Sequence, residues 1–230
     1  KVLDNYIENY HCYFKINKNK KGVNKTELDP LPRVALIAGI GLVTIGKTVK
    51  ETRIAGDVYE RSFQVVRKAF SVGQFYPLKD DDLFDMEYWS LEQAKLGKNV
   101  VPKLQGKVVV ISGAASGIGL GTAKLFAQHG ANLLLLDRDA EKLSTALEEL
   151  KKISNGHITI KTVDITDEKA LDESFSTLLA TYGGLDILIS NAGNALQGSI
   201  GHLDSKALRD SFELNFFAHQ ALASRAVKIF

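Results

Sequence analysis

The second half of the chain alternates short apolar runs with longer amphipathic segments. The runs are rich in leucine and β-branched residues, as in strands that are buried on both faces. They predict strands at residues 107–111, 132–136, 158–163 and 185–190. Apolar positions at helical spacing predict helices that end near residue 128 and that cover 141–152, 167–182 and 206–229. This alternation indicates βαβ units, so we expect an α/β fold with a doubly wound parallel sheet in the order 3-2-1-4.

The first half has a less regular pattern and predicts a smaller α/β unit. Residues 34–37 form an apolar run that predicts a buried strand, and a glycine-rich turn follows it. Apolar positions then recur at helical spacing over 47–72 and over 83–96. The buried face of the second of these helices is expected to hold Phe84, Trp89 and Leu91.

The lysine-rich stretch at 15–25 is predicted to be a solvated loop. No aromatic side chain interleaves its lysines, whereas single-stranded nucleic-acid sites combine basic and aromatic residues. The chain as a whole carries 29 Lys and Arg against 27 Asp and Glu, and this balance favours neither nucleic acid nor an anionic membrane. We therefore expect no nucleic-acid partner.

The composition is that of an ordinary globular protein of one or two domains, with 230 residues, 45% of them hydrophobic. The longest apolar stretch, 34–45, falls short of the roughly 18–20 residues that a membrane span needs, so no membrane association is expected. The single cysteine, Cys12, cannot form a disulfide within the chain, which favours a reducing cytoplasm. The five histidines show no ligand spacing, and we predict no metal site.

A glycine-rich turn follows the first predicted strand of the second half. It reads Ser112-Gly113-Ala-Ala-Ser116-Gly117-Ile118-Gly119. Glycines at such a turn let the backbone approach a pyrophosphate, and the helix that begins there supplies N–H donors. The spacing is Gly-x-x-x-Gly-x-Gly, which differs from the commonest dinucleotide fingerprint. With a strand before it and a helix after it, the turn predicts a dinucleotide site.

The second predicted strand ends at Asp137, 18 residues after Gly119. That spacing is close to the roughly 20 residues expected for the acid that binds the adenine ribose. A carboxylate accepts hydrogen bonds from both ribose hydroxyls and repels a 2′-phosphate, so NAD is favoured over NADP, although Arg138 lies beside it. Without the glycine turn, Asp137 would more often be a residue of a helix N-terminus.

The other two strand ends also carry polar residues. Asp164 could accept from the adenine amino group or could cap the helix that begins near residue 167. The sequence Ser190-Asn191-Ala192-Gly193 ends the fourth strand, at the sheet edge where ligands of open α/β sheets bind. Asn191 could brace that edge through backbone hydrogen bonds or could simply form a turn.

These motifs resemble those of the short-chain dehydrogenase/reductase family, over residues 107–230. The family's Thr-Gly-x-x-x-Gly-x-Gly begins here with Ser112, and its Asn-Asn-Ala-Gly begins with Ser190. The resemblance implies a Rossmann-like fold and hydride transfer between a nicotinamide cofactor and an alcohol, a ketone or a sugar-derived aldehyde. It implies that Asn215 holds a water in a proton relay. The cofactor-binding residues that we predict are Ser112, Gly113, Ser116, Gly117, Ile118, Gly119, Asp137, Arg138, Asp164, Ile165, Asn191, Ala192 and Gly193.

The first half resembles a different family. Residues 29–34, 39–47 and 82–95 look like the junction of bifunctional class II aldolase/short-chain dehydrogenases, similar to rhamnulose-1-phosphate aldolase/alcohol dehydrogenases. Ala38 stands where that pattern often has proline. The resemblance implies an aldolase-like C-terminal remnant at 1–98, a linker at 99–106 and a truncated dinucleotide-binding domain at 107–230.

The family's catalytic Tyr-x-x-x-Lys is not found in this sequence. None of the seven tyrosines is followed four residues later by lysine, and the partner serine lies beyond Asn215 in the family. We therefore expect this chain to hold the cofactor half of an oxidoreductase site without its proton-transfer residues. A non-catalytic dinucleotide-binding module and a decayed remnant are the alternatives.

Self-association is also expected. The apolar strand at 185–190 would lie at an open sheet edge, and the last helix carries a series of apolar side chains. Both features favour a homo-oligomer, and the substrate stays unidentified.

Overall fold

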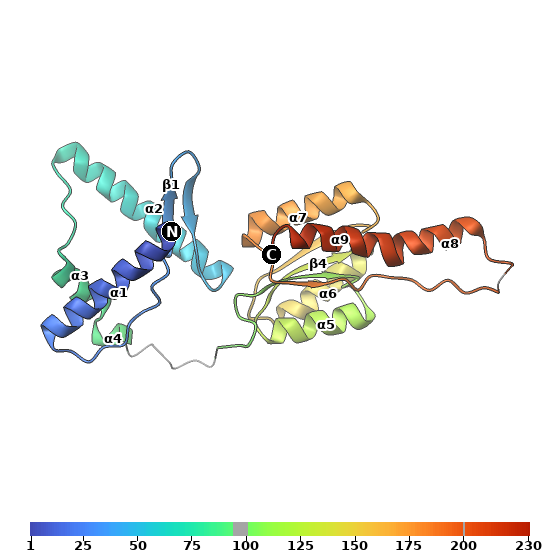
Figure 1. The fold of residues 1–230 in the computed structure, drawn as a ribbon, viewed down its shortest axis with the longest axis horizontal. Coiled ribbons are helices and arrows are strands. Elements are labelled where there is room, and N and C mark those ends of the chain that lie inside the picture. Colours follow the sequence, from blue (N-terminus) through green and yellow to red (C-terminus); the bar gives the residue numbers. More distant parts are fainter. Residues whose placement is uncertain (94–100, 200) are drawn as a thin grey trace. The chain divides into compact units, whose positions relative to one another are not determined.

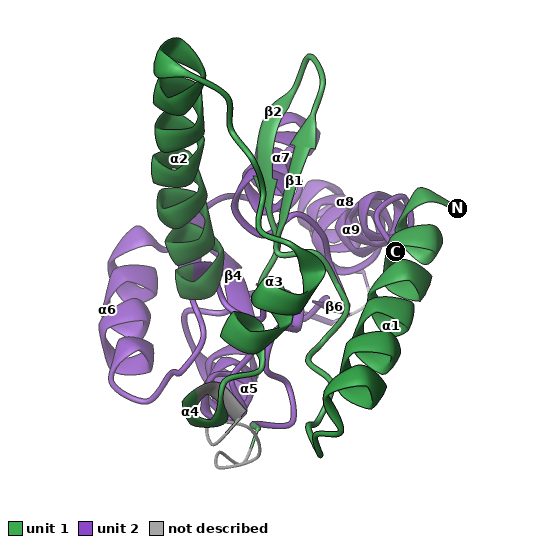
Figure 2. Ribbon diagram, turned by 90° about the vertical axis from the view of Figure 1, so that its left-hand side faces the viewer, with its two compact units in different colours: residues 1–46, 50–101 green, residues 47–49, 102–230 purple. Residues whose placement is uncertain are grey.

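The computed structural model describes residues 1–93, 101–199 and 201–230, in two compact units (Figure 2). One unit comprises residues 1–46 and 50–101, and the other residues 47–49 and 102–230. The elements of the first unit are α1 (Val2–Lys21), β1 (Val34–Ile37), β2 (Gly41–Thr44), α2 (Val49–Val72), α3 (Asp80–Glu87) and α4 (Ser90–Gln93). Those of the second are β3 (Val108–Ser112), α5 (Gly117–Gln128), β4 (Asn132–Asp137), α6 (Ala140–Lys151), β5 (Ile158–Thr162), α7 (Glu168–Tyr182), β6 (Ile187–Ile189), α8 (Ser205–Phe212), the π-helical turn η1 (Glu213–Phe217) and α9 (Ala218–Val227).

The second unit is built on a parallel four-stranded sheet in the order β5-β4-β3-β6. Helices α7 and α9 lie on one side of this sheet, and α5 and α6 on the other (Figure 1). The first strand in sequence, β3, lies between β4 and β6, and Val109 pairs with Ile187 and Ile111 with Ile189. The predicted order 3-2-1-4 is therefore confirmed. The carboxyl ends of β3, β4 and β6 consequently meet at one edge of the sheet, together with the chain that follows β5.

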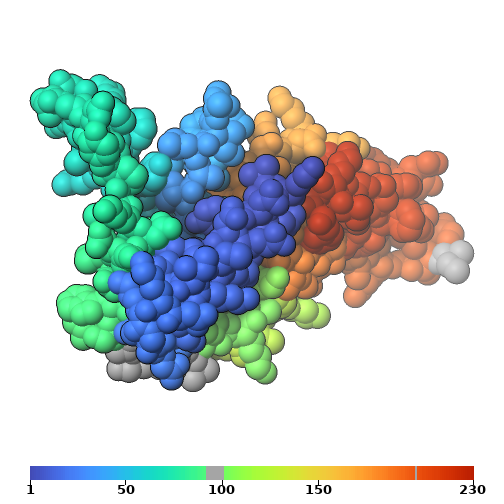
Figure 3. Space-filling view, turned by 60° about the vertical axis from the view of Figure 1, so that its left-hand side comes forward, coloured from blue at the N-terminus to red at the C-terminus, as the bar shows by residue number. Residues whose placement is uncertain are grey.

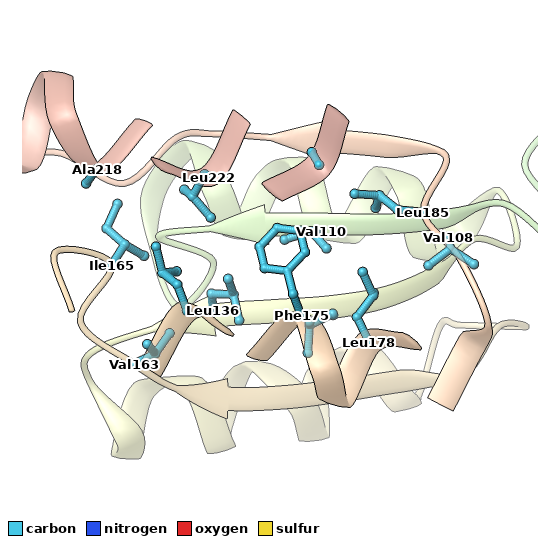
Figure 4. Close-up of a cluster of buried hydrophobic side chains, with 13 residues drawn as sticks. Val108, Val110, Leu136, Val163, Ile165, Phe175, Leu178, Leu185, Ala218 and Leu222 are labelled. Carbon is cyan, nitrogen blue, oxygen red and sulfur yellow. The ribbon is translucent and has the colours of Figure 1, made fainter. Parts of the chain in front are cut away.

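Strand alternation divides the core of this unit into two layers. Val108 and Val110 of β3 face a cluster that contains Phe175 of α7 and Leu222 of α9 (Figure 4). The intervening Val109 and Ile111 belong to the cluster on the opposite face, which α5 and α6 cover. Both faces of the sheet are thus buried under helices, which explains why its strands are continuous apolar runs.

The C-terminal helical segment is not the single α-helix that its apolar spacing predicted over 206–229. It consists of α8, η1 and α9, so a π-helical turn interrupts it at Glu213–Phe217. A π turn adds one residue to a helical turn without removing the amphipathic pattern, so the spacing of apolar residues did not reveal it. Asn215 lies within this turn.

The first unit has its own small core, formed where α1 packs against α3. Phe14, Phe84 and Tyr88 are buried there, and the rings of Phe84 and Tyr88 stack with centroids 4.6 Å apart. The other face of α1 lies at the surface (dark blue in Figure 3). The prediction of a loop over 15–25 is wrong as far as residue 21, because these residues continue α1, whose buried side chains are Phe14 and Asn17. Lys15 and Lys20 are exposed, whereas Lys18 and Lys21 are half-buried. The helix ends at Gly22, which has a left-handed φ of 62°.

Two lysines of α1 pair with acidic residues of α3. Lys20 bonds Asp81, and Lys21 pairs with Asp85 at 2.7 Å. The Lys20 hydrogen bond lowers the pKa of Asp81. The lysine-rich stretch therefore contributes to contacts within the first unit.

Three further predictions for the first unit need correction. Residues 34–37 do form a strand, but it is half-exposed, since β1 and β2 form a two-stranded antiparallel hairpin. The helix predicted over 83–96 begins earlier, at Asp80, and α3 ends at Glu87; residues 94–96 lie outside the described part. Trp89 and Leu91 are 57% and 59% exposed, whereas Phe84 is buried as predicted. No helix in the described ranges is both long and apolar enough to cross a bilayer.

Candidate dinucleotide site

A cavity of about 680 Å³ lies at the carboxyl edge of the parallel sheet. Of the predicted site residues, it is lined by Gly113, Ser116, Gly117, Ile118, Asp137, Arg138, Asp164, Ile165, Asn191, Ala192 and Gly193. The predicted residues Ser112, Gly119 and Asn215 do not line it. The structure thus brings predicted residues from the ends of different strands, from Gly113 to Gly193, together in one cavity.

Two glycines of the β3–α5 turn allow the chain to pack closely at the floor of this cavity. Gly113 has a φ of 64°, and a Cβ atom there would lie 2.9 Å from Ala192 Cα. A Cβ atom on Gly119 would lie 2.0 Å from the Gly113 carbonyl oxygen. Gly119 is buried and therefore acts by its small size, because it lets the first turn of α5 approach the end of β3.

The N-terminus of α5 opens into the cavity with unsatisfied hydrogen-bonding capacity. Ser116 is its N-cap residue, but the Ser116 side chain makes no cap hydrogen bond. The first N–H groups of a helix have no partner within the helix, and here Ser116, Gly117 and Ile118 are exposed at the cavity surface. A pyrophosphate could accept hydrogen bonds from these groups, and the helix dipole favours its negative charge.

Asp137 links the end of β4 to the glycine-rich turn. Its Oδ2 accepts a hydrogen bond from the Ala115 N–H at 2.9 Å, and its Oδ1 accepts one from the Asp139 N–H at 3.0 Å. The N-cap of α6 is Asp139, which accepts from the Lys142 N–H at 3.0 Å. Asp137 is therefore not the cap of the following helix. Each carboxylate oxygen can accept a further hydrogen bond from a ligand in the cavity.

Asp164 forms a turn after β5 and is likewise not a helix cap. Its Oδ1 accepts from the Thr166 N–H at 3.0 Å and from the Thr166 hydroxyl at 2.8 Å. The N-cap of α7 is Asp167, which accepts from the Ala170 N–H at 3.1 Å. The Asp164 side chain is exposed at the cavity with its second oxygen, Oδ2, available to a ligand.

Ser112 and Asn191 hold the ends of β3 and β6 together. The buried Ser112 hydroxyl accepts hydrogen bonds from the N–H groups of Asn191 and Ala192, at 2.9 and 3.1 Å. The Asn191 amide donates in return to the carbonyl oxygens of Ser112 and Gly113. Ser112 therefore shapes the cavity from behind its wall, and Asn191 braces the sheet edge while also lining the cavity.

The segment after β6 is also held from its other side, by η1 and α9. Asn215 Oδ1 accepts from the Asn194 N–H at 3.0 Å, and its Nδ2 donates to the Asn194 carbonyl oxygen at 2.8 Å. His219 bonds Ser190 Oγ through Nδ1 at 2.6 Å and the Ala192 carbonyl oxygen through Nε2 at 2.8 Å. Because a carbonyl oxygen can only accept, Nε2 carries the proton of a neutral His219, and Ser190 then donates to Nδ1.

Several cavity residues were not among the predicted ones. Asp139, Lys142 and Thr166 follow the ends of β4 and β5, whereas Asn194, Asp210 and Glu213 come from the segment after β6 and from α8 and η1. The first group could have been found by extending each strand-end motif by one helical turn. Asn194 directly follows the predicted Ser190–Gly193 motif and could have been found in the same way. Asp210 and Glu213 could not, because only the tertiary fold brings them to the cavity.

The Tyr182 side chain forms hydrogen bonds within the fold. The Tyr182 hydroxyl donates to the Leu133 carbonyl oxygen at 2.9 Å and also contacts Thr159 and His157. Burial raises the pKa of Tyr182 to about 12. Within the described ranges, no group of three His, Cys, Asp or Glu side chains is placed to hold a metal ion.

Comparison with protein families divides the chain in two. Residues 1–96 match the family described as aldolase class II, second domain, and residues 107–230 match the short chain dehydrogenase family. The matched order is that of a fused aldolase and dehydrogenase architecture.

Individual relatives agree with this division. YuxG of Bacillus subtilis strain 168, an oxidoreductase described as uncharacterized, is 30% identical over 197 residues, which cover 84% of this chain and 28% of the relative. Secoisolariciresinol dehydrogenase of Forsythia intermedia is 40% identical over 94 residues, 41% of this chain and 33% of that protein. The chain thus spans about a third or less of the length of these two relatives.

Solved structures resemble the second unit. L-sorbose reductase from Gluconobacter frateurii, complexed with NADPH and L-sorbose, superimposes with a TM-score of 0.53 and 31% sequence identity. The match covers 56% of this chain and 49% of the reductase. These similarities agree with a nicotinamide-dependent Rossmann fold.

Proposed function

The chain belongs to the short-chain dehydrogenase family, and we propose on this premise that its second unit binds NAD as the cofactor half of an oxidoreductase. The observation that carries the proposal is the cavity, which is lined both by the N-terminus of α5, without a side-chain cap, and by Asp137 and Asp164. One part of this arrangement suits a pyrophosphate, and the other suits the hydroxyl and amino groups of an adenosine.

Each end of the cofactor would meet a different kind of group. The N–H groups at residues 116–118 would bind the pyrophosphate, while Asp137 would accept from the ribose hydroxyls and Asp164 from the adenine amino group. The segment 191–194, held by Ser112 and Asn215, forms the wall beside them. When bound, the nicotinamide would exchange a hydride with an alcohol, a ketone or a sugar-derived aldehyde. Asn215 is proposed to position a water for proton relay.

The preference for NAD over NADP is part of the proposal. A carboxylate at Asp137 would repel a 2′-phosphate, whereas Arg138 beside it would attract one. L-sorbose reductase was solved with NADPH, so both cofactors have to be compared directly. The reducing environment of the cytoplasm is our proposed location, because Cys12 is an exposed free thiol. We also propose a homo-oligomer that forms through the edge strand β6 and the α8–α9 segment.

Calorimetric titration with NAD and NADP tests the assignment. We expect NAD to bind more tightly than NADP, and Asp137→Ala to weaken NAD binding by about 1–3 kcal/mol, the scale of a charge-assisted hydrogen bond. Asp57→Ala, an exposed carboxylate of the first unit, is the control and should leave NAD binding unchanged. Tighter binding of NADP by the unmodified chain would show that Asp137 does not have the proposed role.

A further inference from the structure

Beside Asp137 the cavity is lined by a second carboxylate that pairs with a lysine. Asp139 Oδ2 lies 2.8 Å from Lys142 Nζ, and Asp139 Oδ1 accepts from the Lys142 N–H at 3.0 Å. Both residues line the cavity, as does Arg138 between the two aspartates. The hydrogen bond between their side chains lowers the pKa of Asp139 and raises that of Lys142, so the pair stays ionised at neutral pH.

This pairing matters for any ligand that brings a phosphate to the ribose side of the cavity. A phosphomonoester carries about 1.5 to 2 negative charges at neutral pH and is held by lysine or arginine side chains. Among the described residues that line the cavity, only Arg138 and Lys142 are cationic. Lys142 is engaged by Asp139, so the carboxylates of Asp137 and Asp139 would face such a phosphate with Arg138 alone opposing them.

We propose that Asp139 is a specificity-determining residue, which excludes NADP by keeping Lys142 from the 2′-phosphate. The inference rests on the proposed dinucleotide site and adds a second determinant to Asp137. Asp139 is suited to this role because its two oxygens do separate work: Oδ1 caps α6 while Oδ2 holds the lysine. Its charge can therefore be removed without removing the cap.

Asp139→Asn separates these two functions. Asparagine is as good an N-cap as aspartate, so α6 should stay intact, but the neutral amide no longer holds Lys142 as an ion pair. We expect the affinity for NADP to rise about three- to tenfold, while the affinity for NAD changes less than twofold. In the double variant Asp139→Asn/Lys142→Gln the gain should disappear, because the released cation is then missing.

Asp167→Asn provides a matched control. Asp167 caps α7 through the same kind of hydrogen bond, to the Ala170 N–H at 3.1 Å, but it does not line the cavity. This variant should leave the affinities for both cofactors unchanged. Asp139→Ser, which also retains a capping oxygen, serves as a second version if the asparagine variant does not fold.

Titration calorimetry with NAD and NADP distinguishes the possible failures. If the unmodified chain binds neither cofactor, the proposed function itself is wrong. If it binds NAD but neither Asp139 variant gains NADP affinity, or if the gain persists without Lys142, Asp139 does not act through Lys142 and the inference is overturned. The expected gain should also shrink at high ionic strength, since it arises from a solvent-exposed charge.

Discussion

Single residues at the β3–α5 turn determine whether the cavity can form. Gly113 and Gly117 both have positive φ, but only Gly113 is in close contact with another segment, at Ala192. Gly119 has no left-handed φ, and its constraint is steric, because the Gly113 carbonyl oxygen occupies the space of a Cβ atom. The glycines of this motif are thus required for two different reasons: a positive φ at some positions and the lack of space for a Cβ atom at others.

Replacing Gly119 and Gly117 by alanine should separate these requirements. Gly119→Ala should destabilise the second unit by at least about 2 kcal/mol, because a contact of 2.0 Å with backbone cannot relax without moving the turn. Gly117→Ala has open space around its Cβ and should cost only about 1 kcal/mol, through its φ of 53°. Urea unfolding measures both. Equal losses would contradict the steric role of Gly119.

At the scale of elements, β6 is a three-residue strand that depends on side chains at both ends. Before it, Asp186 accepts from the Val108 N–H and from Lys107 Nζ, each at 2.8 Å. After it, the Ser112 hydroxyl accepts from the Asn191 N–H, and the His219 ring bonds the Ala192 carbonyl oxygen. Such a short strand has few ladder hydrogen bonds of its own, so these anchors hold it in register beside β3.

The anchor at Asp186 should make stability depend on pH in acid. Partial burial opposes ionisation of Asp186, but the hydrogen bonds from Lys107 and the Val108 N–H outweigh it and lower its pKa. Because the pKa of Asp186 is lower in the folded state, its ionised form stabilises the fold at pH values above the unfolded-state pKa of about 3.9. This contribution is lost as the pH falls through the folded-state pKa.

The Asp186→Asn variant should therefore be less stable than the unmodified chain at pH 7. Between about pH 5 and about pH 2, the range in which carboxyl groups titrate, the variant should lose less stability than the unmodified chain. Thermal unfolding across that range measures the difference. Glu173→Gln, an exposed acid of α7, is the control. Parallel acid profiles for the Asp186 variant and the unmodified chain would contradict the anchor.

The molecule as a whole exposes apolar surface on its C-terminal segment. Phe212 of α8 and Phe216 of η1 are 57% and 60% exposed, and Leu208 and Phe217 are exposed as well. Within the described residues, β6 lies at the edge of the sheet with β3 as its neighbour. An exposed edge strand and an apolar helical patch are both surfaces on which copies of a chain associate.

We expect the purified 230-residue chain to self-associate on this surface. Sedimentation velocity should show a species larger than the monomer, and Phe212→Asp/Phe216→Asp should shift it toward the monomer, because burying two carboxylates in an apolar interface is unfavourable. Val65→Asp/Phe70→Asp, on exposed positions of α2, is the matched control. A compact monomer without any substitution would contradict the prediction.

The same chain should bind its cofactor without appreciable turnover. Its sequence contains no Tyr-x-x-x-Lys, and general acid–base catalysis alone contributes roughly 10²–10⁴-fold to rate. Following NADH absorbance with a panel of alcohols and sugars measures the activity. Rates typical of a dehydrogenase from the 230-residue protein would show that other residues of this chain transfer the proton.

The sequence predicted the sheet of the second unit because each of its strands is a continuous apolar run between helical segments. It also predicted most of the cavity, since the residues that end parallel strands are brought to one edge by the topology alone. The same reasoning was weaker in the first unit. There α1 depends on Phe14 packing against Phe84 and Tyr88 of a segment some 70 residues away, and no local pattern reveals that contact.

The sequence by itself therefore determined the strand order, the glycine-rich turn and the positions of Asp137 and Asp164, because these follow from periodicity and from spacing along the chain. Only the tertiary structure decided that Asp137 bonds the turn and that η1 and α9 hold the segment after β6. The physical reason is that hydrogen bonds and ion pairs act over about 3 Å, so they depend on side-chain positions that the packing of distant elements fixes.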